Sequence, residues 1–273
     1  MTRACNCQAN FQKDHFALRS FQAHVISCLL AEIERRAALL GNSDPIRILD
    51  AGCGRGDLIS ELMHILRERG KLAGRCELYG FIATDRMAGK TTSCDDLVES
   101  LKARHPEVGW RGRIRLVPSG GPWPFEDRYF DITISSQVLE HSRQLGWYFE
   151  QCYRVLRRSG IGLHCFEASE MSRAIRIFPS LAAGSGLVDS GNDRPGSDGI
   201  CQVIPSWKRV LDIGERVGFK VSPRYNGCLL RRKLSGDSTA YRYSRSLFDN
   251  FAIRLLALWS PVTLISEKVQ RDS

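Results

Sequence analysis

Three glycines at alternate positions, between a predicted strand and a predicted helix, constrain the fold of this chain most. The apolar run Ile46–Asp50 predicts a short strand, and Asp57–Arg69 has the apolar spacing of a helix. Between them stand Gly52, Gly54 and Gly56. Glycines let a backbone turn tightly and approach a ligand closely, because they carry no Cβ. The order strand, glycine turn, helix predicts a βαβ unit with a nucleotide-type site at the turn.

Predicted strands and helices alternate along the rest of the chain. Helices are predicted at residues 16–40, Asp95–Arg104, Leu145–Leu156 and Trp207–Val217. Strands are predicted at Leu78–Asp85, Arg113–Val117, Asp131–Ser135, Ile161–Phe166, from Phe219 onward, and at Val262–Glu267. This alternation predicts an α/β fold with a mostly parallel sheet covered on both faces.

We expect one domain over residues 1–273 with two insertions. A helical extension is expected at 1–45 and the core of the fold at 46–167. The insertions are a glycine-rich stretch at 168–205 and a basic, then apolar, stretch at 226–260. Both follow late strands, where open α/β sheets place their ligand-binding loops. They are therefore the expected acceptor and lid region.

Charge and apolar patterning narrow the class of protein. The net charge is +9, and residues 151–273 contribute +8 of it (19 basic minus 11 acidic). Such a bias suits phosphates, an anionic membrane surface or an acidic partner, although charge alone favours a solvated basic face. There is no run of 18 apolar residues, which argues against a spanning helix. The N-terminus lacks the apolar stretch of a secretory signal, and the ten cysteines show no C-x-x-C pair. We therefore expect a cytoplasmic protein with reduced thiols.

The residues that flank the glycine turn indicate the charge of its ligand. A dinucleotide site has G-x-G-x-x-G spacing and binds pyrophosphate at a helix N-terminus. This turn has G-x-G-x-G spacing, with Asp50 before it and Asp57 after it. Two carboxylates would repel pyrophosphate and suit a cation. The turn favours S-adenosylmethionine, whose amino group and sulfonium are positively charged, over a nicotinamide dinucleotide.

Four segments resemble the class I S-adenosylmethionine-dependent methyltransferases. They are LDAGCGRGDL from Leu49, YGFIATD from Tyr79, WPFEDRYFDITISSQVLEHS from Trp123 and YRVLRRSGIGLHC from Tyr153. The resemblance covers residues 46–167. It implies a Rossmann-like, three-layer α/β/α sandwich whose seven-stranded sheet is mostly parallel, with an antiparallel last strand. Residues 46–167 would then be the cofactor-binding core.

The resemblance also implies which residues bind S-adenosylmethionine. Those expected around its methionine part are Asp50, Gly52, Cys53, Gly54 and Gly56. Asp85 is expected at the ribose hydroxyls, with Arg86 and Met87 along the adenine. Ser119 takes the place of an acid that often contacts the adenine amino group. Ser136 and Gln137 are expected at the mouth, where the methyl group faces the acceptor.

His141 is the candidate catalytic residue. A hydroxyl acceptor must lose a proton, and His141 follows the fourth predicted strand of the core at its carboxyl end. His141 could instead anchor its loop through hydrogen bonds, and Glu140 is open to the same two interpretations. His164 is expected to be a hydrogen-bonded core residue. No metal is expected, since Glu126 and Asp127 fit a solvated turn and Asp131 the start of a strand.

These residues favour O-methylation of a small molecule, a glycan or a lipid-linked acceptor. RNA or protein methylation is an alternative, although the strand continues into Ser135-Ser136-Gln137 and lacks the Asn-Pro-Pro motif of base methylation. A module that binds S-adenosylmethionine without catalysis is another. The amphipathic segment Ser246–Trp259 fits either contact with a membrane surface or a helix packed on the sheet.

Overall fold

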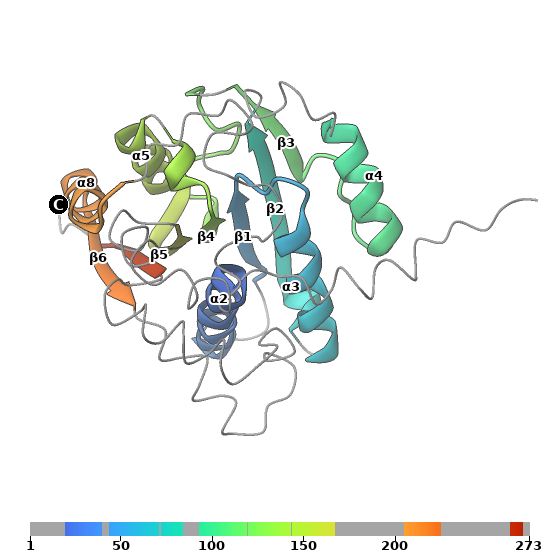
Figure 1. The fold of residues 1–273 in the computed structure, drawn as a ribbon. Helices are drawn as coiled ribbons and strands as arrows, with labels where there is room; N and C mark the ends of the chain where they lie inside the picture. Colours follow the sequence, from blue (N-terminus) through green and yellow to red (C-terminus); the bar gives the residue numbers. More distant parts are fainter. Residues whose placement is uncertain are drawn as a thin grey trace, which may run out of the picture.

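One seven-stranded sheet forms the centre of the protein (Figure 1). The computed structural model describes residues 20–39, 44–70, 72–83, 93–118, 120–142, 144–166, 205–224 and 263–269. Its strands are β1 Ile46–Ala51, β2 Cys76–Ala83, β3 Ile114–Val117, β4 Phe130–Ser136, β5 Leu156–Cys165, β6 Phe219–Arg224 and β7 Thr263–Lys268.

The strand order is β3-β2-β1-β4-β5-β7-β6. The pairs from β3 to β5 are parallel, whereas β7 runs antiparallel to both β5 and β6. The expected mostly parallel sheet with an antiparallel last strand is confirmed.

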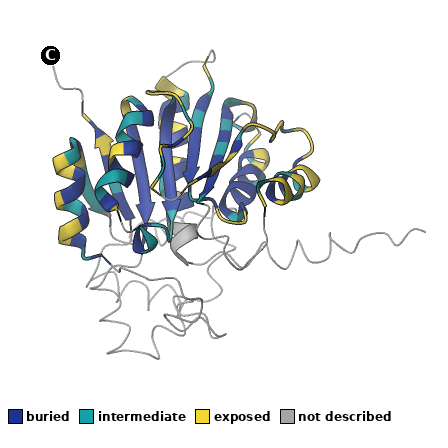
Figure 2. Ribbon diagram, turned by 90° about the horizontal axis from the view of Figure 1, so that it is seen from above, coloured by how far each residue is buried: buried dark blue, intermediate teal, exposed yellow. Residues whose placement is uncertain are grey.

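Helices cover both faces of the sheet (Figure 2). On one face lie α2 (Ser20–Leu39), α3 (Asp57–Glu68) and α4 (Cys94–Arg104), which share one buried apolar cluster with β1 and β2. On the other face, α5 (Leu145–Val155) and α8 (Trp207–Val217) share a second cluster. The expected three-layer α/β/α sandwich is therefore confirmed.

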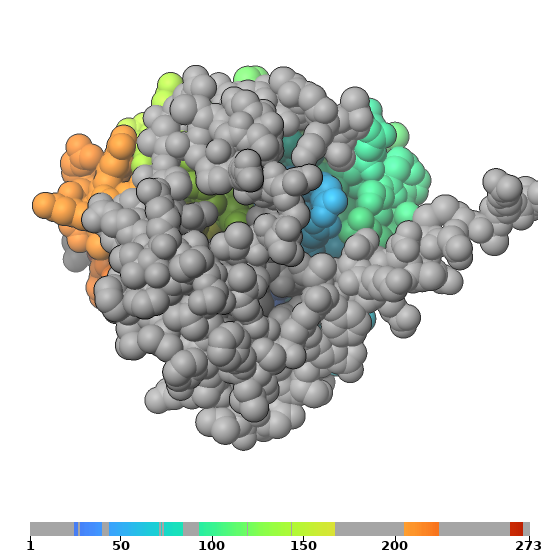
Figure 3. Space-filling view, in the orientation of Figure 1, coloured from blue at the N-terminus to red at the C-terminus, as the bar shows by residue number. Residues whose placement is uncertain are grey.

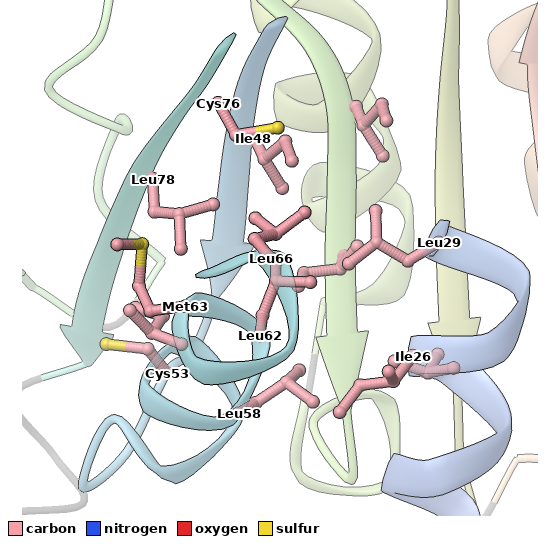
Figure 4. Packing of buried hydrophobic residues seen from close by; sticks show 14 of the residues in the cluster. Ile26, Leu29, Ile48, Cys53, Leu58, Leu62, Met63, Leu66, Cys76 and Leu78 are labelled. Atoms are coloured by element: carbon pink, nitrogen blue, oxygen red, sulfur yellow. The ribbon is translucent and has the colours of Figure 1, made fainter. Parts of the chain in front are cut away.

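The apolar spacing of α3 explains how it docks on the sheet. Leu58, Leu62 and Leu66 recur every four residues, so they lie on one face of the helix and point toward the strands (Figure 4). Ile26 and Leu29 of α2 complete this layer of the core. Both the α3 and α2 residues are almost fully buried.

A buried ionic network holds α2 at the amino end of the sheet. The Asp131 carboxylate at the start of β4 is buried and lies 3.5 Å from the Arg36 guanidinium and 3.3 Å from that of Arg157. It also accepts a hydrogen bond from the Arg47 backbone N–H at 2.9 Å. Arg36 in turn donates to the Ser159 carbonyl oxygen at 2.7 Å. Asp131 therefore joins α2 to β1, β4 and β5.

Three strands begin earlier than the sequence pattern predicts, and for β4 the difference is the single residue Phe130. β2 begins at Cys76 instead of Leu78, because Cys76 pairs with Ile46 at the start of β1, whereas its predicted end at Asp85 lies outside the described residues. β5 begins at Leu156 instead of Ile161, because Leu156 pairs with Phe130 before a register shift. The helix predicted at Trp207–Val217 is confirmed residue for residue.

The predicted insertions at 168–205 and 226–260 lie outside the described residues, apart from Pro205, and so does the amphipathic segment Ser246–Trp259. α8 and α4 reach the surface on opposite flanks of the molecule (Figure 3). Among the described helices, none is long and apolar enough to cross a membrane. The six described cysteines are free thiols.

Candidate functional site

The candidate site lies where the carboxyl ends of β1 and β4 meet. These strands are neighbours, and the chain builds the sheet outward from them in opposite directions, through β2 and β3 on one side and β5 on the other. Open α/β sheets bind ligands at such a switch point, because the two following loops diverge and leave a crevice.

The turn after β1 has the backbone conformation that only glycine adopts readily. The φ angles of Gly52, Gly54 and Gly56 are +86°, +53° and +75°. A hydrogen bond joins the turn to β2, in which the Cys53 N–H donates to the Phe81 carbonyl oxygen at 2.9 Å. Within the turn, the Gly56 N–H donates to the Cys53 carbonyl oxygen at 2.8 Å. α3 then begins at Asp57.

The three glycines face different surroundings. A Cβ on Gly52 would lie 2.8 Å from a methyl group of Val138, and one on Gly56 would lie 2.8 Å from a methyl group of Leu97. Among the described residues, nothing lies within 4 Å of a Cβ placed on Gly54. Gly52 and Gly56 thus let protein segments pack closely, whereas no described segment packs on Gly54.

Asp50 is a buried acid beside the glycine turn. It is 3% exposed, and its Oδ2 has no hydrogen-bond partner among the described residues. Burial, together with the nearby Asp57 carboxylate, raises the pKa of Asp50 to about 8. Asp57 itself is more exposed and forms an ion pair with Arg55 at 3.1 Å. Of the two acids that flank the turn, Asp50 is the one without a counter-ion among the described residues.

The loop after β4 forms the other wall of the site. Gln137 has a φ of +56°, which is unfavourable for a residue with a side chain, and its N–H donates to the Cys165 carbonyl oxygen at 2.8 Å. The chain then enters the short helix η3 (Leu139–His141). The Ser136 Oγ and the His141 Nδ1 are buried without a hydrogen-bond partner among the described residues.

Val138 brings the two walls together, because its methyl groups pack directly on Gly52. The turn that carries Asp50, Gly52, Gly54 and Gly56 therefore lies beside the loop that carries Ser136, Gln137 and His141, at the carboxyl ends of β1 and β4.

The match to a family of known proteins covers this same region. Residues 49–163 match a family model described as a methyltransferase domain. They are similar to the methyltransferase domains of that family. The cofactor of this family is S-adenosylmethionine.

The domain is similar to several known proteins. Squalene methyltransferase 1 from Botryococcus braunii is 23% identical over 207 residues, which cover 73% of this chain and 46% of that protein. The structure of the CurJ carbon methyltransferase aligns with a TM-score of 0.52 at 14% identity, over 90% of this chain and 54% of that one. The DszA carbon methyltransferase gives 0.51 at 18% identity, with the same coverage. The chain spans about half the length of each, and at these identities the two structures establish the fold.

The residues of the methyltransferase domain fit its cofactor. The buried Asp50 Oδ2 without a partner suits a cationic amino group, since an unpaired buried charge is costly and a counter-ion offsets that cost. The open position at Gly54 lets a ligand reach the backbone of the turn. Asp50 would hold the amino group of S-adenosylmethionine, and the glycine turn its methionine part.

Cys53 occupies the glycine turn, but its side chain points away from the crevice. It is 7% exposed and lies in the core beside Met63 (Figure 4). Its Sγ would be 2.8 Å from a Cβ placed on Gly80, so β2 needs a glycine there. Burial raises the pKa of the Cys53 thiol well above its usual value. Any contact of Cys53 with the cofactor is therefore limited to its backbone.

The expected nucleoside contacts Asp85, Arg86, Met87 and Ser119 lie outside the described residues. β2 ends at Ala83 and β3 at Val117, each two residues before one of these positions. The carboxyl ends of β1, β2 and β3 share one edge of the sheet, because the three strands are parallel.

His164 is a core residue, as expected. It is fully buried, and its Nδ1 and Nε2 lie 3.0 Å and 3.3 Å from the hydroxyls of Ser135 and Ser266. Burial lowers the pKa of His164 to about 3, so the imidazole is neutral. Glu140 is also buried, in η3. Among the described residues, no three His, Cys, Asp or Glu side chains gather as a metal site requires.

The sequence gives no indication of two contributions to this site. One is Val138, whose role depends on the approach of two loops that are far apart in the chain. The other is the connection between β3 and β4, which Gln151 and Arg154 of α5 hold by hydrogen bonds. The segment from Trp123 resembles a family motif. The spacing of apolar residues nevertheless cannot show which side chains bind this connection.

Proposed function

We propose that this chain is an S-adenosylmethionine-dependent methyltransferase that acts on a small molecule. The observation that carries the proposal concerns the described residues: the buried Asp50 Oδ2 has no hydrogen-bond partner among them, and none of them lies within 4 Å of a Cβ placed on the neighbouring Gly54. A carboxylate in this environment repels the phosphates of a dinucleotide and attracts an ammonium group. The match of residues 49–163 to the methyltransferase domain family supports the same cofactor.

The protein's part in the reaction is to bind, to orient and to exclude water. When bound, S-adenosylmethionine supplies an electrophilic methyl group on a sulfonium. Asp50 fixes the amino group, and the backbone of the glycine turn fixes the methionine chain. The acceptor then sits beside Ser136 and His141, held in line with the methyl group. Such alignment can supply roughly 7–11 kcal/mol of a reaction barrier.

We propose oxygen as the methylated atom and His141 as the base. The support is the His141 Nδ1, which is buried at the wall of the crevice without a partner among the described residues and can accept a proton from an acceptor hydroxyl. The proposed acceptor is a small molecule, a glycan or a lipid-linked compound. The excess of basic residues in 151–273 would favour an anionic acceptor. A cytoplasmic location stays a prediction from the sequence.

Carbon methylation of an apolar acceptor is the second candidate. Squalene methyltransferase 1 and the CurJ and DszA carbon methyltransferases are named for reactions at carbon or on a hydrocarbon. On an alkene acceptor, a base would remove a proton after the transfer, and the buried Nδ1 of His141 would again be placed for it.

A radiolabelled-methyl assay tests the proposal and separates the two candidates. Purified protein is incubated with labelled S-adenosylmethionine and host extract, and the products are divided into small-molecule, lipid, glycan, RNA and protein fractions. Label in a small-molecule, lipid or glycan fraction is expected. Hot hydriodic acid then releases label from O-methyl groups as volatile methyl iodide and leaves C-methyl groups in place. Label confined to RNA or protein would refute the proposed acceptor class.

Replacing His141 tests its role. His141→Ala should leave the affinity for S-adenosylmethionine unchanged and lower the turnover by roughly 10²–10⁴-fold, which is the usual contribution of a general base. The affinity is measured by titration calorimetry and the turnover with the acceptor found above. His141→Gln is the matched control, because it can anchor the loop by hydrogen bonds but cannot act as a base. Full turnover in His141→Gln would assign His141 to loop anchoring.

A further inference from the structure

The connection between β3 and β4 is held from α5 by two side chains. The Arg154 guanidinium donates to the carbonyl oxygens of Trp123 and Phe125, each at 2.8 Å, and to the Asp127 carboxylate at 2.7 Å. Its remaining donors bind the Gln151 side-chain oxygen at 2.9 and 3.2 Å, and that oxygen also accepts the Trp123 N–H at 3.1 Å. Gln151 and Arg154 thus fix the connection on both sides of Pro124.

The bonds to main-chain carbonyls matter most in this arrangement. Asp127 is 70% exposed, and an ion pair in water contributes little to stability. The Trp123 N–H and the Gln151 side chain are buried, where an unmade hydrogen bond is costly. Arg154 therefore acts mainly as a planar fork that sets the path of the backbone, a role for which the lysine point charge is poorly suited.

Two aromatic rings link this connection to the strand that binds the glycine turn. The buried Trp123 ring lies 4.6 Å from the ring of Phe81 on β2 and 5.3 Å from that of Tyr148 on α5. Phe81 is also the residue whose carbonyl oxygen accepts the Cys53 N–H. The Trp123 ring is thus wedged between α5 and the strand that fastens the turn.

We propose that Arg154, with Gln151, is a positioning residue for the glycine turn of the S-adenosylmethionine site. This inference rests on the proposed function and adds residues that the methyl-transfer scheme does not use. By fixing the backbone at Trp123, the two side chains hold the connection and the end of β2 in one arrangement before the ligand arrives. A site that is ordered in advance binds more tightly, because less freedom is lost on binding. Neither side chain touches the cofactor in this scheme.

The test compares two arginines of similar exposure. Arg154→Met removes the fork and keeps the length of the side chain. Arg157→Met is the matched control, because Arg157 is 31% exposed against 28% for Arg154, lies three residues away and contacts the Asp131 carboxylate instead of the connection between β3 and β4. Affinity for S-adenosylhomocysteine is measured by titration calorimetry at 15 °C, and melting temperatures are recorded for each protein. Gln151→Leu and Arg154→Lys complete the set.

Arg154→Met and Gln151→Leu should each weaken binding by about tenfold or more, as the loss of charge-assisted or buried hydrogen bonds implies. Arg157→Met should lower the melting temperature without changing the affinity, and Arg154→Lys should recover part of the loss. If Arg154→Met melts above 15 °C and binds as tightly as the unchanged protein, the inference is overturned and the proposed function stands. If Arg154→Met does not fold, Gln151→Leu decides in the same way. If the unchanged protein shows no binding, the proposed function and this inference both fail.

Discussion

Ionisation of Asp50 lowers the stability of the free protein, but the ionised side chain can bind a cationic group of the ligand. The Asp50 pKa of about 8 lies far above the usual value of about 3.9, so the folded state holds this proton more tightly than the unfolded state does. The stability that this proton provides is fully present below about pH 4 and is lost as the pH rises through 8. A bound ammonium group would reverse this shift, because it favours the ionised carboxylate.

Asp50→Asn separates the two effects. The variant should weaken binding of S-adenosylmethionine by roughly 10–100-fold, since it removes the charge that holds the amino group. Without ligand, it should be more stable than the unchanged protein at pH 8, because the amide carries no charge to bury, and this gain should shrink toward pH 4. Titration calorimetry and urea unfolding at both pH values measure these changes. Asp57→Asn is the control, and a loss of affinity there as large as in Asp50→Asn would contradict the assignment.

At the scale of elements, the site depends on the contact between the turn after β1 and the loop after β4. Gly52 lies against Val138, whereas Gly54 faces open space. Both have positive φ angles, so alanine at either position costs roughly 1–2 kcal/mol from the backbone. The 2.8 Å approach of Val138 adds a clash at Gly52 that Gly54 does not have.

A double-mutant cycle measures this contact. Gly52→Ala should lower the free energy of unfolding more than Gly54→Ala does, and adding Val138→Ala should recover part of the loss at Gly52 but none at Gly54. Gly54→Ala should still weaken cofactor binding, because its methyl group would fill the open position. Unfolding in urea gives the free energies and calorimetry the affinities. Additive effects of Gly52→Ala and Val138→Ala would mean that the two loops are not coupled through this contact.

The sequence predicts most elements because their apolar spacing reports burial. The helix at Trp207–Val217 begins after the capping residue Ser206 and ends before Gly218, and both signals can be read locally. The start of β5 is different, since Arg157, Arg158 and Ser159 show no strand pattern. They belong to β5 because Leu156, just before them, pairs with Phe130 of β4 ahead of a register shift. That pairing is a contact between distant segments, which the local sequence does not show.

The candidate site divides in the same way. The glycine turn and Asp50 are contiguous in the chain, so their chemistry can be predicted from spacing. Two other contacts join residues that are more than 25 positions apart in the chain. Val138 packs on Gly52, and Arg154 donates a hydrogen bond to the Trp123 carbonyl oxygen. Such contacts depend on how the elements pack, which no local pattern encodes.

For the whole molecule, buried histidines set the response to acid. His105 is 1% exposed, and burial, together with the Arg67 guanidinium, lowers its pKa to about 4. Its Nε2 lies 2.9 Å from the Ser60 hydroxyl on α3. The unfolded chain takes up the proton near pH 6.5 and the folded protein does not. The stability linked to His105 is therefore full above pH 6.5 and is lost as the pH falls through 4.

Replacing His105 tests this dependence. The free energy of unfolding of the unchanged protein, minus that of His105→Gln, should fall as the pH drops from 7 to 4, by about 1.4 kcal/mol for each pH unit below 6.5 at most. Urea unfolding at pH 7, 5.5 and 4.5 provides the values. The half-buried His64 gives the control variant His64→Gln, which is measured at the same pH values. A difference for His105→Gln that does not change with pH would show that the folded and unfolded protein bind the His105 proton equally well.

The central claim is that the turn at Gly52, Gly54 and Gly56 binds a cationic sulfur nucleoside next to Asp50. The most direct measurement is a crystal structure of the protein with S-adenosylhomocysteine, whose amino group is the same as that of the methyl donor. The account predicts an amino nitrogen within about 3 Å of an Asp50 carboxylate oxygen, with the amino-acid chain lying along the turn at Gly54. A turn left empty at saturating ligand, or one that instead binds a nicotinamide dinucleotide, would contradict it.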